Sequence, residues 1–130
     1  MILVVLSLGM GGLLVELALI AHYEDAAQWV PLVLLPIALL ALTIDFLLPD
    51  SRAQLILQLT MVLMIAAGVL GIYFHFHGSR EFQLEMDPQM RGANLVWHVL
   101  RAKSPPTLAP GLMVHLGILG LGYVYLRRAR

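Results

Sequence analysis

The chain has 130 residues, of which 60 % are hydrophobic and 12 % are charged, and its formal net charge is zero. A soluble domain carries roughly 25 % charged residues, and a chain this short cannot bury so much apolar surface within itself. The balanced charge gives no sign of a nucleic-acid partner, and the lack of cysteine excludes disulfides and thiolate-ligated metals. We therefore expect a lipid bilayer to surround most of the chain.

Four stretches predict transmembrane helices, because a helix needs about 20 mainly apolar residues to cross a hydrocarbon core of roughly 30 Å. They cover residues 2–21, 30–48, 55–76 and 108–126. No Lys or Arg follows Met1 and no small-residue cleavage site ends the first stretch, which favours a retained span over a signal peptide. Residues 48–52 carry a dense turn signal between the second and third spans.

The short links between the first three spans make neighbouring helices antiparallel. The predicted fold is therefore all-α: one transmembrane domain over residues 1–130, arranged as an integral membrane four-helix up-down bundle. A polar segment, residues 77–107, separates the third and fourth spans.

The polar segment shows two local patterns. Residues 81–87 alternate polar and apolar side chains, which is typical of a half-buried strand. Asp87 and Pro88 then form a helix-start signal, and a short amphipathic helix is expected from there to Ala102. This helix would lie in the membrane interface and end at residues 104–106. Trp97 on this helix, and Trp29 at the start of the second span, are predicted interface anchors.

The basic residues favour one orientation. Arg127, Arg128 and Arg130 follow the last span directly, whereas the first link, residues 22–28, has no Lys or Arg. The positive-inside rule then places both termini in the cytoplasm. We expect the host membrane to be a bacterial cytoplasmic membrane.

Ionisable residues gather toward one membrane face. Four antiparallel spans place all five histidines on that face or just below it: His22, His75, His77, His98 and His115. Glu16 and His115 both lie roughly 8–10 Å beneath the same interface, since each residue adds 1.5 Å to a helix. Because an ionisable group in lipid is costly and usually finds a partner, we predict that these two side chains face inward and interact.

The histidines leave ligand hypotheses open. Haem b needs two facing histidines at similar depth, which His22, His75 and His115 could supply. His75 and His77 could bind a divalent metal together with His22 or Asp25. A quinone or a lipid tail could contact three aromatic residues: Tyr23, Trp29 and Trp97. The expectation of no cofactor is the simpler one, since interfacial histidines can be merely solvated, and haem b is the leading alternative.

Small residues predict close helix packing. Gly9 and Gly12 share the Glu16 face, Ala67 and Gly71 have small-xxx-small spacing, and the fourth span has a stripe of five residues: Gly111, His115, Ile118, Gly122 and Tyr125. Asp45, near the end of the second span, is expected to reach the interface or Arg52.

The sequence lacks nucleophile–base, phosphate-loop and HExxH patterns, so we do not expect an enzyme. The leading interpretation is a small accessory or structural subunit of a larger membrane protein complex, contacting lipid and other membrane subunits. It would pack through its glycine-rich faces and residues 77–107. The alternatives are a redox or ligand-binding membrane protein, with haem b or quinone at the histidines, and a pH- or metal-responsive regulator.

Overall fold

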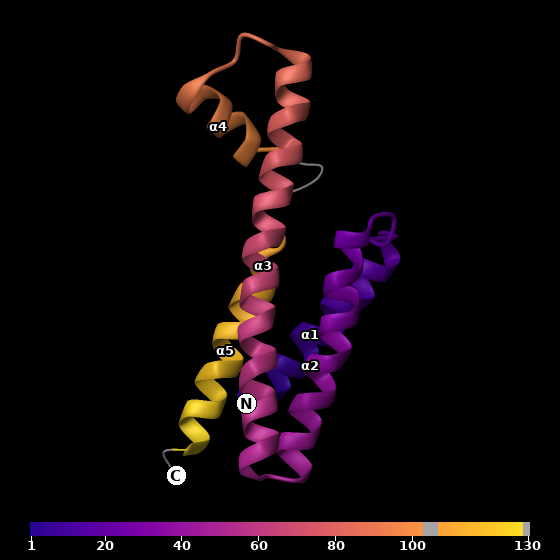
Figure 1. Cartoon of the computed structure of the whole chain (residues 1–130), viewed down its shortest axis with the longest axis vertical. Coiled ribbons are helices and arrows are strands. Elements are labelled where there is room, and N and C mark those ends of the chain that lie inside the picture. Colours follow the sequence, from indigo (N-terminus) through magenta and orange to yellow (C-terminus); the bar gives the residue numbers. More distant parts are fainter. Residues whose placement is uncertain (103–106, 129–130) are drawn as a thin grey trace. The chain divides into compact units, whose positions relative to one another are not determined.

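The computed structural model describes residues 1–102 and 107–128, and every regular element in these ranges is helical (Figure 1). The elements are α1 (Ile2–Leu19), the short 3₁₀ helix η1 (Ala26–Gln28), α2 (Trp29–Leu47), α3 (Ser51–Met86), α4 (Gly92–Leu100) and α5 (Gly111–Arg128). The all-α prediction is thus confirmed for the described ranges. The chain divides into two compact units, and α3 contributes to both: a first unit, Met1–Ala67 with Met113–Arg130, and a second unit, Gly68–Leu112.

α1 and α2 form a helical hairpin in the first unit (Figure 1). α1 ends in a left-handed turn at Ala21, whose φ is 54°. The amide of His22 donates to the carbonyl oxygen of Leu17 at 2.9 Å, which is a common closure of a helix C-terminus. In the link, Oε1 of Gln28 accepts a hydrogen bond from the amide of Glu24 at 2.7 Å. The short link predicted between the first two spans is confirmed.

α3 is one continuous helix of 36 residues, and its length corrects two predictions. It begins at the predicted turn, where Oδ1 of Asp50 accepts from the amide of Ala53 at 2.7 Å, as an N-cap does. It then passes residue 76, the predicted end of the third span, and continues to Met86. The strand prediction for residues 81–87 is therefore wrong. This run is rich in good helix formers, and extending an existing helix costs far less than starting a new element.

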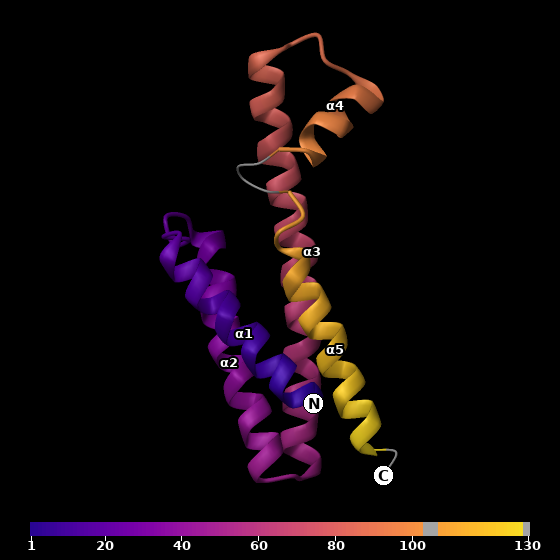
Figure 2. The same cartoon turned by 180° about the vertical axis from the view of Figure 1, so that it is seen from behind.

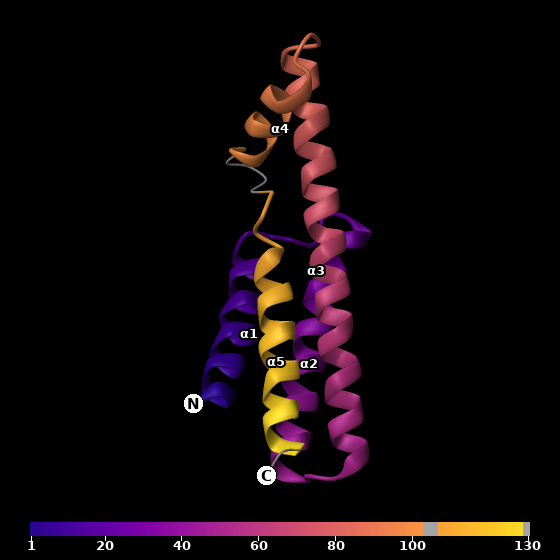
Figure 3. The ribbon, with the colours of Figure 1, turned by 90° about the vertical axis from the view of Figure 1, so that its left-hand side faces the viewer.

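α4 is a short helix in the second unit, beside the last turns of α3 (Figure 3). The amphipathic helix that the sequence predicts is present, but it starts at Gly92 and not at Asp87. Oδ1 of Asp87 accepts from the amide of Gln89 at 3.1 Å, so Asp87 closes a turn instead. Gly92 has a φ of 60°, which glycine adopts without strain, and this bends the chain into α4. The predicted stop at residues 104–106 lies outside the described residues.

The end of α4 is fixed by a buried hydrogen bond. The hydroxyl of Thr107 donates to the carbonyl oxygen of Val99 at 2.8 Å, and both residues are buried. In the same unit, a Cβ added to Gly71 would lie 2.8 Å from Cβ of Pro110, so the chain passes closely over α3 at this glycine. The small residue at position 71 therefore serves close packing, as its spacing predicts.

The hydrophobic core of the first unit lies between α1, α2, the first part of α3 and α5 (Figure 2). Leucine and methionine supply most of it: Leu6, Met10, Leu35, Leu42, Leu57, Met61, Met64, Met113 and Leu116. Unbranched methionine side chains adapt to irregular gaps, which suits helices that approach at different distances. This core holds the C-terminal ends of α2 and α5, where the candidate site lies.

Two glycines bring α5 against α3. A Cβ on Gly117 would lie 2.6 Å from Cγ1 of Ile65 and 2.8 Å from the backbone oxygen of Met61. A Cβ on Gly120 would overlap the side chain of Met61. The sequence predicted packing along a different stripe of α5. A Cβ on Gly122 of that stripe meets nothing within 4 Å, whereas a Cβ on Gly111 would lie 3.8 Å from Cδ1 of Ile72.

Three helical segments are long and apolar enough to cross a membrane: Ile2–Leu19, Ala26–Leu47 and Ser51–Met86. The apolar part of α5, Gly111–Arg127, is shorter. Large apolar side chains are exposed along these helices, among them Leu8, Leu40, Leu59 and Val62. Water disfavours such a surface and lipid accepts it. The chain is therefore a membrane-associated helical protein whose apolar helices contact lipid.

Candidate functional site

Asp45 occupies the last turn of α2 and has a side chain only 3 % exposed. It lies on the same helix face as Ala38, Ala41 and Leu42, all of which are buried. The two small alanine side chains leave room for another helix to approach α2. Burial of a carboxylate is costly unless a cation and hydrogen-bond donors compensate its charge.

α5 supplies both compensating groups from one face, since Tyr123 and Arg127 are four residues apart. Nη1 of Arg127 lies 2.6 Å from Oδ2 of Asp45 and 2.9 Å from the hydroxyl oxygen of Tyr123. The hydroxyl of Tyr123 donates in turn to Oδ2 of Asp45 at 3.3 Å. The guanidinium carbon of Arg127 also lies 5.7 Å from the centroid of the Tyr123 ring. We refer to Asp45, Tyr123 and Arg127 as the acid–base cluster.

The guanidinium also closes the end of α2. Nη1 of Arg127 donates to the backbone oxygen of Asp45 at 2.9 Å. α2 ends at Leu47, so this oxygen belongs to the last four carbonyl groups of the helix, which lack the usual partner within it. A cation there also complements the negative end of the helix dipole. One side chain therefore neutralises a buried carboxylate and caps a helix.

The side chains of the acid–base cluster connect two helices. Its carboxylate, phenol and guanidinium satisfy one another, and no buried side-chain nitrogen or oxygen atom lacks a hydrogen-bond partner in the described ranges. Charge-assisted hydrogen bonds of this length are the strong ones, and they are stronger away from water. The arrangement fixes the C-terminal end of α5 to the C-terminal end of α2.

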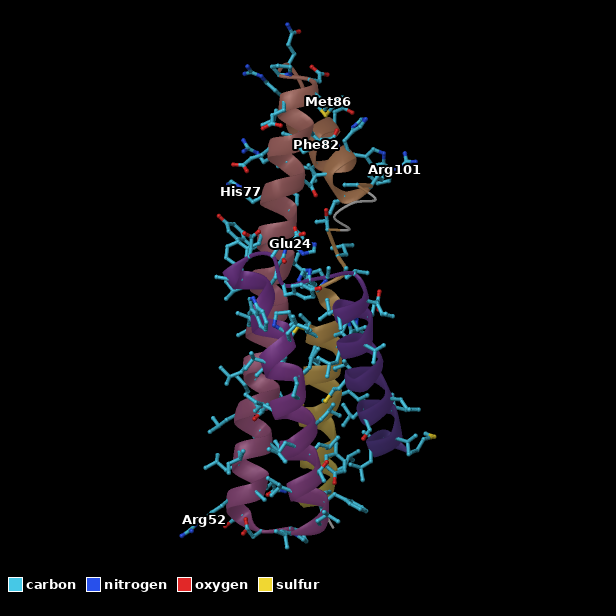
Figure 4. The ribbon with its side chains drawn as sticks, turned by 90° about the vertical axis from the view of Figure 1, so that its right-hand side faces the viewer. Glu24, Arg52, His77, Phe82, Met86 and Arg101 are labelled. Atoms are coloured by element: carbon cyan, nitrogen blue, oxygen red, sulfur yellow. The ribbon has the colours of Figure 1, made fainter. Side chains whose placement is uncertain are left out.

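Sequence reasoning missed this cluster. It assigned Asp45 to the interface or to Arg52, but Asp45 is buried and Arg52 is exposed, projecting from the first turn of α3 (Figure 4). Two signals were available: the shared face of Asp45 with Ala38 and Ala41, and the Tyr123–Arg127 spacing. Neither signal says which helix lies opposite, and this depends on the tertiary packing.

The predicted pair Glu16–His115 lies on exposed surfaces of the first unit. Glu16 is in the last turn of α1, and His115 is in the second turn of α5. α1 and α5 do touch, because a Cβ on Gly9 would lie 2.7 Å from Cδ2 of Leu116. The inward orientation expected for Glu16 and His115 is not adopted within this chain, and their interaction stays a prediction.

The histidines are distributed over both units. His22 and His115 belong to the first unit, and His75 and His77 to the second. His75 and His77 are two positions apart on a helix, so they do not share a face. Nδ1 of His77 lies 3.4 Å from Oε1 of Glu81, one turn farther along α3. Within residues 1–102 and 107–128, no three His, Asp or Glu side chains form a group that could hold a metal ion. The haem b, quinone and metal hypotheses stay predictions.

Both tryptophans are exposed, as interface anchors would be. The ring centroid of Trp29 lies 6.2 Å from that of Tyr23, at the start of α2. The guanidinium carbon of Arg101 lies 5.6 Å from the centroid of the Trp97 ring, on α4. Their placement at a membrane surface stays a prediction.

Comparisons of this chain with models of protein families, with curated proteins and with solved structures find no match.

Proposed function

We propose that the protein is a small accessory or structural subunit of a larger membrane protein complex. In this proposal α1, α2, α3 and α5 all cross one bilayer, as a four-helix up-down bundle. The membrane is a bacterial cytoplasmic membrane, and both termini lie in the cytoplasm. The acid–base cluster has a structural role, in which it closes the bundle at its cytoplasmic end.

The observation that carries the proposal is the exposed face of α1 around Glu16. Gly12, Val15, Glu16 and Leu19 recur at helical spacing and are all exposed. A charged side chain facing lipid at a helix centre costs about 2.5–3.5 kcal/mol, and somewhat less near the end. A partner helix that supplies a hydrogen-bond donor removes this cost, and the bare Gly12 lets its backbone approach closely.

The outer stripe of α5 supports the same conclusion. His115, Ile118, Gly122 and Tyr125 are all exposed, so the chain does not use them for its own core. Like the α1 face, this stripe combines small, polar and aromatic side chains at helical spacing, as helix–helix interfaces in membranes do. Two such faces on a chain of 130 residues favour a role in assembly.

The test is site-specific photocross-linking in the native membrane with the full chain. A photoreactive residue at Val15, which is 58 % exposed beside Glu16, should give a defined adduct with another membrane protein. The same residue at Leu40, which is 60 % exposed on α2, is the matched lipid-facing control and should give none. The substitution Glu16→Leu should abolish the Val15 adduct, because it removes the group that the partner recognises.

Two results would contradict the proposal. One is an equal cross-linking pattern at Val15 and Leu40. The other is a Val15 adduct that persists unchanged in Glu16→Leu. The histidine-based alternative is tested separately by a visible absorption spectrum of the purified protein, in which a bis-histidine haem gives strong Soret and α bands.

A further inference from the structure

A groove lies between the end of α3 and the start of α4, wholly within the second unit. Its volume is about 400 Å³, within the range of small-molecule sites. Its wall combines two guanidinium groups with apolar side chains: Arg80, Arg91, Leu84, Pro88, Met90 and Leu95. The groove lies within residues 77–107, through which the proposed subunit would also pack, but the arguments from the exposed faces of α1 and α5 do not use it.

The two arginines are the charged part of the wall. Both are exposed, and neither has an ion-pair partner in the part of the chain that the structure describes. Arg91 is also the N-cap residue of α4 and makes no side-chain capping bond, and Gly92 next to it lines the groove. Two guanidinium groups beside uncapped amides favour an anion with several oxygen acceptors, and phosphate matches the planar fork of arginine.

The apolar part of the wall favours an anion that carries hydrocarbon. Leu84 and Leu95 face the groove from α3 and α4, and Met90 lies between the two helices along the chain. Outside the groove, Phe82 and Met86 are exposed on α3, and Trp97 is exposed on α4. Figure 4 shows Phe82 and Met86 on the last turns of α3. Such side chains suit the boundary between headgroups and acyl chains.

The position of Arg80 along α3 fits the same boundary. The apolar run of this helix ends at Phe76, four residues earlier, which is about 6 Å along the axis. The headgroup layer extends roughly 5–8 Å beyond the hydrocarbon. If Phe76 marks the end of the apolar crossing, the Arg80 guanidinium lies at phosphate depth.

We propose that the α3–α4 groove binds the phosphate of an anionic phospholipid headgroup through Arg80 and Arg91. The lipid origin of the phosphate depends on α3 crossing the membrane, but not on any partner subunit. A failure of the cross-linking test above would therefore leave this site intact.

The test is native mass spectrometry of the full chain in detergent with equimolar phosphatidylglycerol and phosphatidylcholine. The wild type should retain phosphatidylglycerol about tenfold more often than phosphatidylcholine. The double substitution Arg80→Gln with Arg91→Gln should bring the ratio close to one. Arg101→Gln is the matched control, because Arg101 directly follows α4 as its C-cap residue but does not line the groove, and it should keep the preference.

Inorganic phosphate, titrated calorimetrically, distinguishes the two sources of the anion. Binding that depends on Arg80 and Arg91, without a preference for phosphatidylglycerol, would support a phosphate site that serves a free anion. Equal lipid ratios in the wild type and the double variant, with no phosphate binding, would overturn the site. An equal loss of preference in Arg101→Gln would also overturn it, since the effect would then be one of net charge. Unchanged circular dichroism excludes unfolding as the cause.

Discussion

Among the described residues, Asp45 is the only buried Asp, Glu, Lys or Arg. A buried ion pair is a weak source of net stability, because desolvation of both charges offsets most of their attraction. Loss of one partner is a different matter, since the other charge is then left uncompensated. At the residue scale, the importance of the acid–base cluster therefore lies in what happens when it is broken.

Arg127→Gln should lower the free energy of unfolding in detergent by about 2–4 kcal/mol, because it leaves the Asp45 carboxylate without a cation. Asp45→Asn should cost less, since the amide can still hydrogen-bond. The double variant should lose less than the sum of the two single variants, with a coupling of at least about 1 kcal/mol. Reversible unfolding in mixed detergents measures all three values.

Arg52→Gln is the control for the acid–base cluster, because Arg52 is exposed and lies at the neighbouring turn. Its effect should stay within about 0.5 kcal/mol, as is usual for surface substitutions. Strictly additive effects of Asp45→Asn and Arg127→Gln would show that the two groups do not stabilise each other. A loss in Arg52→Gln equal to that in Arg127→Gln would point to a general effect of charge at this end of the first unit.

At the scale of the elements, α5 has two faces that differ in their packing within the chain. Its inner face carries Gly117 and Gly120 against α3, with Tyr123 and Arg127 farther along the same side. Its outer face carries His115 and Gly122, which the chain leaves exposed. Glycine on the inner face allows backbone approach, which is how helices in lipid gain van der Waals contact.

Alanine substitutions on α5 should therefore show graded effects. Gly117→Ala should destabilise by about 1–3 kcal/mol, because the new methyl group meets the backbone oxygen of Met61, which cannot move alone. Gly120→Ala should cost less, since it meets only the flexible Met61 side chain. Gly122→Ala should be neutral or slightly stabilising in the isolated chain, because it meets open space and alanine is the better helix former.

Thermal unfolding in one detergent ranks the three glycine variants. The loss of thermal stability should be largest for Gly117→Ala, smaller for Gly120→Ala and smallest for Gly122→Ala. A different order would contradict the packing of α5 against α3. In the native membrane, Gly122→Ala has a second use. If a partner helix covers the outer face of α5, this substitution should weaken the assembly without changing the stability of the chain itself.

The sequence predicts the helices of this chain better than their contacts. Composition and the length of apolar runs locate α1, α2 and the start of α3, because lipid demands long uninterrupted helices. The run at residues 81–87 misleads, since seven residues of alternating polarity are too few to separate a strand from a helix. The faces of α5 mislead for another reason. In lipid, a helix face that packs within its own chain and a face that packs against another chain are both rich in small and polar residues, so composition does not separate them.

The acid–base cluster was missed because Asp45 is 78 residues from Tyr123 and 82 residues from Arg127 in sequence. Periodicity assigns Asp45 to a face with Ala38 and Ala41, but nothing local identifies the helix that covers this face. For the same reason, the sequence does not indicate that Glu16 and His115 are exposed in this chain. The depth of a residue in the membrane can be counted along its helix from the sequence. The direction in which its side chain faces depends on how the whole helix is rotated about its axis, and this rotation is set by the packing of all neighbouring helices.

At the scale of the whole molecule, the length of α3 raises the question of where the membrane ends. A helix of 36 residues is about 54 Å long, whereas the hydrocarbon core is roughly 30 Å thick. Its N-terminal part is apolar, and its last turns carry His77, Arg80, Glu81 and Glu85. We infer that these last turns extend beyond the hydrocarbon and present α4 at the membrane surface.

The number of crossings depends on α5, because its apolar part, Gly111–Arg127, is shorter than the other three apolar segments. Its C-terminal end contacts the C-terminal end of α2 through Arg127 and Asp45, so both ends should lie at the same membrane face. The chain has no cysteine, and single cysteines can therefore report each side. Ala26→Cys and Gln89→Cys should react with an impermeant maleimide in intact cells. Ser51→Cys and a cysteine added after Arg130 should react only after permeabilisation. A C-terminal cysteine that reacts together with Gln89→Cys would leave three crossings and remove α5 from the bundle.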